Sequence, residues 1–323
     1  MPGTTGEESR TDSCAIVVTH YPGLKDLLGL LNELNRETDF LVIDNGSPQA
    51  DQYRASILTC NRCVGFLQLP ENIGLAEALN KGLQEVRKRN YRFAFLFDQD
   101  SRPGDAFVNN MLAAFARAET LAEGRLAALG PRIINHRNQR QTPFKLFNRL
   151  LRRSDQPFHG ASGLFQADFL ITSGTLLPLA CLEQTGDMKA SYFIDNIDLE
   201  WCFRARMRGY ELAGTSDAVL YHAIGEPSNN PLVRRGLMAQ HKPARTYYSS
   251  RNRVHLYRQH YAPLGWKLRD IPRFFLKAVW LILTSTERRQ YWRNISAGIR
   301  DSRNLDGDEA APGRGGSDSA HRP

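Results

Sequence analysis

The stretch RFAFLFDQDS, residues 92–101, decides the predicted fold, because an almost wholly apolar segment ends there in two carboxylates, Asp98 and Asp100. On an extended chain, residues i and i+2 point to the same side, with Cα atoms roughly 6.5–7 Å apart. The two carboxylates therefore repel each other unless a cation or a hydrogen-bond donor lies between them. The same spacing recurs at Asp306 and Asp308 in a Gly-rich tail. Only the position at the end of a predicted strand makes the first pair a candidate site.

Apolar strands and amphipathic helices alternate on the N-terminal side of this stretch. The segments CAIVVTH (14–20), FLVIDNGS (40–47) and VGFLQLPEN (64–72) predict strands, whereas LKDLLGLLNEL (24–34) and GLAEALNKGLQEVRKRN (74–90) predict helices. Near-continuous apolar strands separated by helices predict an α/β fold with a mostly parallel sheet that is covered on both faces. In such sheets ligands bind beyond the carboxyl ends of the strands.

Two further strands are predicted in the second half of the chain. QADFLITSGTLLP (166–178) predicts a strand that runs into a small-residue turn at 173–175, where a ligand can approach the backbone closely. AVLYHAIGE (218–226) predicts a strand that places His222 at its end. A single histidine is either a structural residue or a metal ligand, and the strand-end carboxylates elsewhere keep the metal alternative open.

Acidic residues open the helix that we predict within YFIDNIDLEWCFRARMRGY (192–210). From Asp195 onward the pattern is helical, so Asp195 and Asp198, three residues apart, would share one face. Glu200 and Arg204 have the i,i+4 spacing of a surface ion pair. Acids in a first helical turn also favour the helix dipole. The ion pair and the helix dipole account for some of these acids, and either Asp195 or Asp198 can direct its carboxylate into a cleft.

Composition limits the class of protein. The chain has 323 residues, 41% of them hydrophobic and 24% charged, and can bury a sizeable core. Its five cysteines include one C-x-x-C, Cys60 and Cys63, without a second pair to complete a zinc site, so reduced thiols are expected. The polar N-terminus lacks the apolar core of a secretory signal, and a cytoplasmic protein is expected. Neither G-x-G-x-x-G nor G-x-x-x-x-G-K-S/T occurs.

Positive charge is concentrated in the C-terminal third of the chain. Residues 231–303 contain 16 Lys or Arg against 3 acids, within a chain whose net charge is +8. This balance predicts an anionic partner, such as a membrane surface, and no nucleic-acid-binding motif accompanies it. Within the region, nine of the ten residues 274–283 are apolar. That run is too short to span a bilayer, so it is either a core helix or an interfacial anchor.

Several polar or glycine residues at the predicted strand ends and helix starts are candidates for ligand contact. They are Thr19, Tyr21, Asp44, Gly46, Asn72, Gly74, Asn80, Asp98 and Asp100. An Asp–Asp pair can share a divalent ion with a diphosphate. Two alternatives stay open, because Asp44 also fits a turn and Asn72 also fits a helix N-cap.

Eight motifs in order carry a family resemblance. They are VVTHYPG, VIDNGS, ENIGLAEALNKG, FLFDQDS, ITSGTLLP, FIDNIDLEWCFRARMRGY, YHAIGE and YYSSRNRVHLYRQHY. Over residues 15–261 the chain resembles the inverting family-2 glycosyltransferases of the GT-A fold. It is most similar to the bacterial rhamnosyltransferases that build O-antigen and related polysaccharides. The resemblance implies a Rossmann-like nucleotide-binding half in a catalytic domain at 13–230, followed by a basic helical region at 231–303. Disordered ends are expected at 1–12 and 304–323.

The same resemblance implies roles for individual residues. Asp98 and Asp100 match the pair that holds Mg²⁺ or Mn²⁺ on the sugar nucleotide, and His222 matches the histidine that completes the metal site. Asp198 matches the catalytic base, followed by the acidic position of Glu200. The glutamate that precedes the base in the family is Ile197 here, which leaves Asp195 as a rival base.

For the nucleotide, Asp44 matches the acid that contacts base and ribose, and Thr19 and Tyr21 match the first loop around the nucleotide. The remaining expected donor contacts are Gly46, Asn72, Gly74, Asn80 and Gln99. The implied activity is transfer of L-rhamnose from dTDP-L-rhamnose to a lipid-linked glycan, on the cytoplasmic face of the inner membrane. The alternatives are a UDP-hexose or UDP-galactofuranose donor, and a catalytically silent sugar-nucleotide-binding or scaffold protein.

Overall fold

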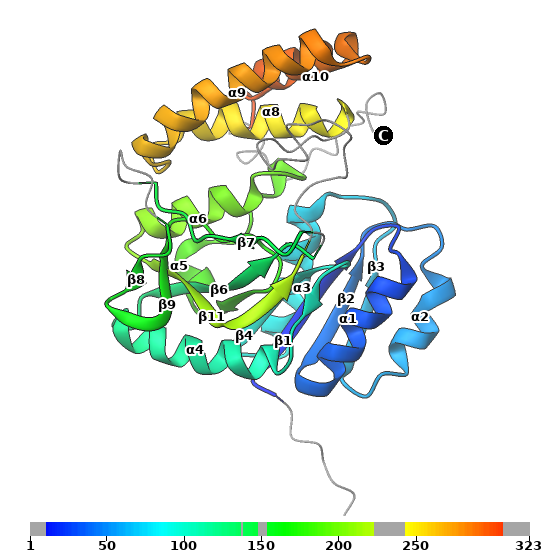
Figure 1. Ribbon diagram of the computed structural model, residues 1–323. Coiled ribbons are helices and arrows are strands. Elements are labelled where there is room, and N and C mark those ends of the chain that lie inside the picture. Colours follow the sequence, from blue (N-terminus) through cyan, green and yellow to red (C-terminus); the bar gives the residue numbers. More distant parts are fainter. Residues whose placement is uncertain (1–10, 137, 148–153, 223–242, 306–323) are drawn as a thin grey trace, which may run out of the picture.

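A mixed sheet with helices on both faces forms the centre of the molecule (Figure 1). The computed structural model describes residues 11–136, 138–147, 154–222 and 243–305. The strands are β1 (Ser13–Thr19), β2 (Asp39–Asp44), β3 (Cys63–Gln68), β4 (Phe93–Asp98), β5 (Arg102–Pro103), β6 (Leu126–Ile134), β7 (Gln141–Thr142), β8 (Pro157–Phe158), β9 (Ala161–Ala167), β10 (Thr175–Pro178) and β11 (Glu211–Tyr221). The helices are α1 (Leu24–Glu37), α2 (Asp51–Leu58), α3 (Leu75–Lys88), α4 (Phe107–Leu121), α5 (Cys181–Thr185), α6 (Ile197–Met207), α8 (Pro243–Arg258), α9 (Leu264–Thr284) and α10 (Arg288–Asp301), with a 3₁₀ turn η1 (Ala190–Tyr192).

The strand order is β3-β2-β1-β4-β10-β6-β11-β9-β8. The pairs β1–β2, β1–β4 and β2–β3 are parallel, whereas β10 pairs antiparallel with both β4 and β6. The predicted parallel sheet is therefore confirmed for the first four long strands. Beyond them the sheet is mixed.

The strand predicted to start at 166 and to run into a turn at 173–175 is wrong in its bounds. Strand β9 ends at Ala167, a turn occupies 168–174, and β10 begins at Thr175. The carboxylate of Asp168 in that turn forms an ion pair with Arg206 at 2.8 Å, and Gly174 has a φ of +76°. The ion pair with the distant Arg206 and the positive φ of Gly174 interrupt the strand that the local apolar pattern favours.

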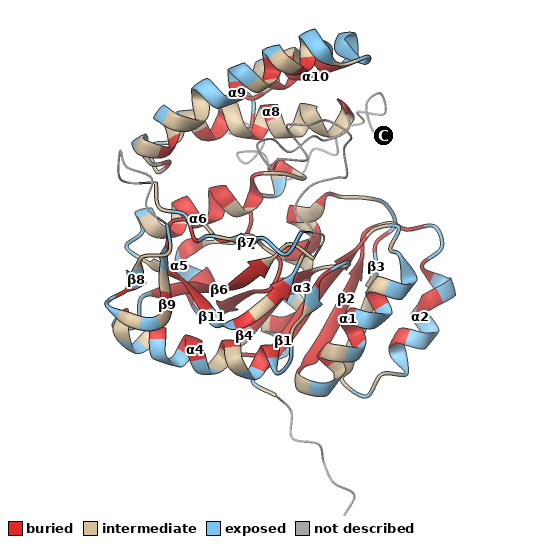
Figure 2. Cartoon of the chain, viewed as in Figure 1, coloured by how far each residue is buried: buried red, intermediate tan, exposed pale blue. Residues whose placement is uncertain are grey.

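Two hydrophobic clusters cover the opposite faces of the sheet. One packs α3 and α6 against the sheet through residues such as Leu83 and Trp201. The other packs α1, α2 and α4 against it through residues such as Leu31 and Phe115. The helical periods of α1 and α3 are thus explained by burial on both sides of the same sheet (Figure 2). This rigid arrangement fixes the positions of the strand ends.

The helix that we predicted to begin at Asp195 begins instead at Ile197. Asp195 and Asn196 have φ values of +68° and +60°, a left-handed conformation that Asp and Asn tolerate better than most residues. Asp195 and Asp198 therefore do not share a helical face, as the sequence pattern had predicted. Asp195 belongs to the loop before the helix, and Asp198 to its first turn.

Helices α8, α9 and α10 form a layer on one side of the α/β sheet and its helices (Figure 1). Two small clusters hold this layer, and one of them joins Leu199 and Phe203 of α6 to Leu256 and Trp266 of the layer. No helix in the described part of the chain is long and apolar enough to cross a membrane. The expected disordered ends and the expected boundary at 230 fall mostly on residues 1–10, 223–242 and 306–323, which lie outside the described residues.

Candidate functional site

The carboxyl ends of three neighbouring strands bring polar side chains to one edge of the sheet. In the parallel register, Thr19 of β1 lies opposite Asp44 of β2, and Val18 lies opposite Asp98 of β4. The strand-end residues that sequence analysis selected are thus brought together by backbone pairing. In sheets of this kind ligands bind beyond this edge.

Asp98, Asp100 and His222 form a cluster of potential metal ligands. One ligand atom from each residue lies within 4.8 Å of the other two. His222 Nε2 is 3.8 Å from an oxygen of Asp98, and its Nδ1 is 3.8 Å from an oxygen of Asp100. His222 follows directly after β11, and its backbone N–H donates to the carbonyl of Ile134 at 3.0 Å.

The chemistry of this cluster fits a divalent cation. His222 Nδ1 is buried and has no hydrogen-bond partner among the described residues. Two carboxylates and an imidazole are ligands that Mg²⁺ and Mn²⁺ accept. The hydroxyl of Ser173 donates to the Asp98 carboxylate, so the small-residue turn before β10 orients one of the ligands. A cation here would also relieve the repulsion between Asp98 and Asp100.

Asp44 lies beneath this surface rather than on it. Its carboxylate is fully buried and accepts from Thr19 Oγ1 at 2.8 Å, from Tyr53 Oη at 2.5 Å and from the backbone N–H of Ser47 at 2.7 Å. Burial and the hydrogen bond to Asp44 together raise the pKa of Tyr53 to about 12. In this conformation Asp44 and Thr19 hold the loop after β2 and expose no surface to a nucleotide.

His20, which sequence analysis did not select, connects the loops that surround the site. Its backbone N–H donates to Gln99 Oε1 at 2.7 Å, and its Nδ1 is 2.9 Å from the carbonyl oxygen of Asn45. Its Nε2 is 3.3 Å from Asn72 Nδ2. Gln99 and Asn72 are thus placed at the site by His20. Its position next to the strand-end residue Thr19 was the available signal.

Two glycines allow close approach of the surrounding loops. Gly46 has a φ of +79°, and a Cβ there would overlap the backbone of Glu71 and Asn72. Gly74, at the N-terminus of α3, has a φ of +91°, and a Cβ there would lie 2.8 Å from the Cα of Phe193. Any side chain at either position would separate these loops.

Two other predicted donor-binding residues differ in exposure. The Asn80 side chain is half-buried and bonds both backbone groups of Met188, at 2.9 and 3.0 Å. Tyr21 is 60% exposed, and its backbone N–H donates to Ser47 Oγ at 2.9 Å. Asn80 therefore joins α3 to the chain that leads to α6, whereas the ring of Tyr21 is accessible to a ligand.

Asp198 is a partly buried carboxyl in the first turn of α6. It accepts from the backbone N–H of Leu199 at 2.9 Å and, with residues such as Trp201 and Met188, lines a cavity of about 20 Å³, enough for one water molecule. Burial, together with the negative charges of Asp195 and Asp98, raises the pKa of Asp198 to about 7. A carboxyl with this pKa exchanges a proton near neutral pH and is suited to acid–base catalysis.

Asp195, the rival base, is held in an ion pair. Arg245 Nη2 donates to Asp195 Oδ1 at 2.6 Å, and Nε lies 3.0 and 3.1 Å from the two carboxylate oxygens. A two-pronged contact with arginine stabilises the carboxylate and occupies its oxygens. Arg245 lies on α8 in the C-terminal layer, and sequence analysis did not select it.

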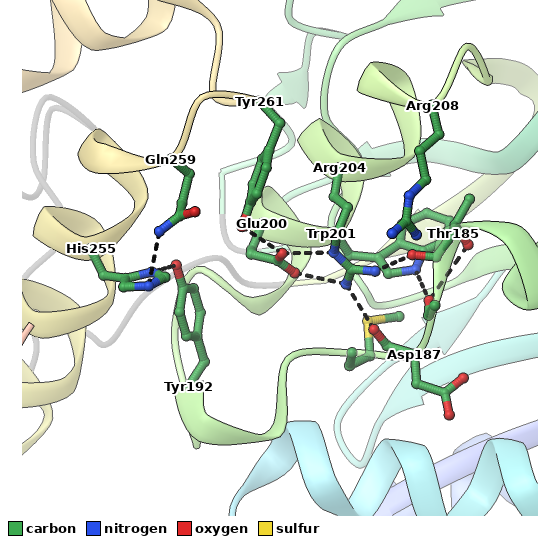
Figure 3. Close-up of polar contacts among 12 residues, drawn as sticks. Thr185, Asp187, Tyr192, Glu200, Trp201, Arg204, Arg208, His255, Gln259 and Tyr261 are labelled. Carbon is green, nitrogen blue, oxygen red and sulfur yellow. Dashed lines mark hydrogen bonds and ion pairs between the residues drawn. The ribbon is translucent and has the colours of Figure 1, made fainter. Parts of the chain in front are cut away.

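The third acid, Glu200, lies in a buried network (Figure 3). Arg204 Nε and Nη2 donate to its two oxygens at 2.7 and 2.9 Å, and the Tyr261 hydroxyl donates at 2.8 Å. The same arginine donates to the carbonyl of Asp187 at 2.7 Å. The i,i+4 ion pair that the sequence predicts is present, but it is buried and joins α6 to two other segments.

Comparison with known proteins agrees with this geometry. Residues 15–170 match the protein family Glycosyl transferase family 2. The dTDP-rhamnosyl transferase RfbF of Shigella flexneri is 27% identical over 293 residues, which cover 86% of this chain and 91% of that protein.

Solved structures share the fold at low sequence identity. S. aureus TarS in complex with UDP-GlcNAc superposes with a TM-score of 0.55 at 15% identity, over 92% of this chain and 88% of that chain. The mannosyltransferase PcManGT of Pyrobaculum calidifontis, in complex with GDP-Man and Mn²⁺, gives 0.54 at 15% identity, over 95% and 77%. GalNAc-T7 with UDP, GalNAc and Mn²⁺ gives 0.58 at 11% identity, and this chain spans about half of it, 55%. The fold is GT-A, and the chain is a glycosyltransferase with a family 2 domain.

Proposed function

We propose that this glycosyltransferase transfers L-rhamnose from dTDP-L-rhamnose to a hydroxyl of a glycan acceptor with inversion at the anomeric carbon. The proposal rests first on the pairing of a candidate base, Asp198, with the cluster of Asp98, Asp100 and His222, whose Asp98 is near enough for its charge to raise the pKa of Asp198. An inverting transfer needs one base for the acceptor and one site for the departing diphosphate. The similarity to RfbF over most of the chain supports the choice of donor.

In this proposal each cluster has one task. Asp198 takes the proton from the acceptor hydroxyl as its oxygen attacks the anomeric carbon. Asp98, Asp100 and His222 would hold Mg²⁺ or Mn²⁺, and a divalent ion supplies charge stabilisation for the departing nucleoside diphosphate. Asp195 is bound by Arg245, which favours Asp198 as the base. The exposed ring of Tyr21 and the side chain of Gln99 contact the nucleotide part of the donor.

The acceptor that we propose is a lipid-linked glycan on the cytoplasmic face of the inner membrane. A second candidate donor is a UDP-hexose or UDP-galactofuranose, because the solved relatives of this fold include a complex with UDP-GlcNAc. A silent binding protein would not need a carboxyl whose pKa is raised to about 7 beside the metal-ligand cluster.

Hydrolysis of a panel of sugar nucleotides tests the proposal. We expect the purified protein to hydrolyse dTDP-L-rhamnose slowly in the presence of Mg²⁺ or Mn²⁺, faster than UDP-glucose or UDP-galactofuranose. Asp198→Asn should bind dTDP with near-normal affinity but transfer the sugar about 10²–10⁴-fold more slowly, because an amide cannot take the proton. If the protein hydrolysed a UDP-sugar but not dTDP-L-rhamnose, the proposed donor would be wrong. If Asp195→Asn, and not Asp198→Asn, lowered the transfer rate while leaving dTDP binding near normal, the proposed base would be wrong.

A further inference from the structure

Helix α9 has two opposite faces, and only one of them is packed. Trp266, Phe274, Ala278 and Leu281 are buried. At about 100° per residue, these four positions lie within one sector of the helix about 120° wide. They pack against α6, α8 and α10, so the buried face of α9 is explained by contacts within the molecule.

The other face is apolar and exposed. Six large hydrophobic side chains are 51–73% exposed: Leu264, Leu268, Phe275, Leu276, Val279 and Leu283. Their positions also fall within a sector about 120° wide, opposite the buried one. Trp292, near the start of α10, is 62% exposed as well. Figure 2 shows α9 and α10 as the outermost layer of the molecule, with exposed residues along its outer side. We call the six α9 side chains the apolar stripe.

Basic residues border the apolar stripe. Between residues 264 and 293 the sequence contains seven Lys or Arg and two acids, Asp270 and Glu287. Asp270 is bonded to the Tyr257 hydroxyl at 2.6 Å and lies 3.5 Å from Arg253, so its charge is turned inward. Arg273 and the cluster of Arg288, Arg289 and Arg293 are exposed. Glu287 is exposed as well, so the exposed charges between residues 264 and 293 are four arginines and one acid, and the surface around the stripe is positive.

The charge and length of this surface indicate which partner binds to it. A second copy of the chain would bring two basic borders together, which opposes a symmetric dimer. Apart from two prolines, residues 306–323 contain no apolar side chain larger than alanine. Residues 223–242 carry three basic residues and one acid, so their charge has the same sign as the border. An anionic lipid surface matches both the apolar stripe and its basic border. At 1.5 Å per residue, the 21 residues of α9 extend about 30 Å, long enough to lie along such a surface.

We propose that the apolar stripe, Trp292 and the basic border dock this enzyme on the surface of an anionic phospholipid bilayer, with α9 parallel to the membrane plane. Helix α8 then lies between the membrane and the catalytic fold (Figure 1). The docking places the site one helical layer away from the lipid. This brings the enzyme to the surface where a lipid-linked acceptor is carried.

Sedimentation with vesicles tests the proposal. We expect the wild-type protein to sediment with vesicles that contain phosphatidylglycerol at low salt, and less at high salt or with phosphatidylcholine alone. The fluorescence emission should shift to the blue on binding, and Trp292→Phe should remove much of the shift. Leu276→Ser with Val279→Ser should weaken binding at least about tenfold, because both apolar side chains leave the stripe. Arg288→Gln, Arg289→Gln and Arg293→Gln together should remove the salt dependence.

Leu28→Ser with Leu58→Ser is the matched control, since these leucines are 38% and 47% exposed on α1 and α2. This variant should bind vesicles like the wild type. The affinity for dTDP, measured without lipid, shows that each variant is folded and keeps the test separate from the proposed donor. Protein that stays in the supernatant at every lipid composition would overturn the proposal. So would a wild-type dimer in solution that becomes monomeric when Leu276 and Val279 are replaced.

Discussion

Asp198 owes its chemical character to its surroundings rather than to its residue type. An aspartate in water titrates near pH 4, but burial and the charges of Asp195 and Asp98 raise the pKa of this carboxyl to about 7. The backbone N–H of Leu199 opposes that shift without cancelling it. The site thus keeps a proton acceptor close to its midpoint at neutral pH.

The raised pKa has a consequence for stability as well as for rate. Between about pH 4 and pH 7 the folded protein binds a proton at Asp198 that the unfolded chain releases, so the free energy of unfolding should fall as pH rises through this window. Asp198→Asn, which does not titrate, should lose less stability over the same window. Denaturant unfolding of chelator-treated protein at several pH values measures the difference. Parallel curves for the two proteins would contradict the raised pKa.

His222 gives a second prediction at the scale of one residue. His222→Ala should remove most of the tightening of dTDP binding by Mg²⁺ or Mn²⁺, because one of three potential ligands is lost. Binding without metal should change little. His159→Ala is the control, since that exposed histidine pairs with Glu211 on the opposite part of the sheet. Calorimetry of dTDP with and without the ion decides the matter. Equal metal dependence in the wild type and His222→Ala would exclude this histidine from the site.

The residues that sequence analysis found and missed differ in one respect. Asp98, Asp100 and His222 follow directly after apolar strands, and the strand pattern locates them. Arg245 and Asn252 lie in a helix whose partners are more than 45 residues away along the chain. No local pattern marks such a contact. Their role becomes visible only when α8 is packed against the loop before α6.

At the scale of elements, α8 holds the loop that carries the acids. The Asn252 side chain donates to the carbonyls of Tyr192, Ile194 and Asp195 at 2.7, 2.8 and 2.9 Å. The Phe193 ring stacks on Tyr248 with centroids 4.7 Å apart. These contacts stabilise backbone conformations with positive φ, which are unfavourable without such support. The local sequence favours a helix here, and packing against α8 explains why the helix starts two residues later.

Asn252→Ala should therefore impair catalysis more than donor binding. Loss of the amide contacts to three carbonyls, which share two N–H groups, should cost about 1–3 kcal/mol of stability, and displacement of the loop should lower kcat about 10–100-fold. The affinity for dTDP should stay near normal, because the strand-end cluster is untouched. Asn294→Ala is the control, since that amide of α10 donates to the Pro243 carbonyl at 2.8 Å and does not contact the loop. If kcat fell only in proportion to the fraction of folded protein, the role of Asn252 would be structural alone.

At the scale of the whole molecule, the C-terminal layer is packed into the catalytic fold. One hydrophobic cluster contains residues of α6, α8 and α9 together, and Leu305, which follows α10, is 3% exposed and belongs to the main core. Sequence analysis placed a boundary at residue 230, where the basic region begins. The distribution of charged residues along the sequence describes the surface, however, and does not predict which apolar residues of the two regions are buried together. We therefore propose that the two regions unfold as one cooperative unit.

Adjacent aromatic residues of α10 allow a direct test of this coupling. Tyr291 is 2% exposed in the cluster that joins α9 and α10, whereas Trp292 is 62% exposed. Tyr291→Ala should cost about 3 kcal/mol or more through the cavity and lost contacts, and should lower the melting temperature in a single transition. Trp292→Ala should leave the melting temperature almost unchanged. If calorimetry of Tyr291→Ala showed an early separate transition while dTDP still bound with normal affinity, the C-terminal layer would be an independent domain. A single lowered transition, with binding lost at the same temperature, would show that the stability of the catalytic site depends on the layer packed against it.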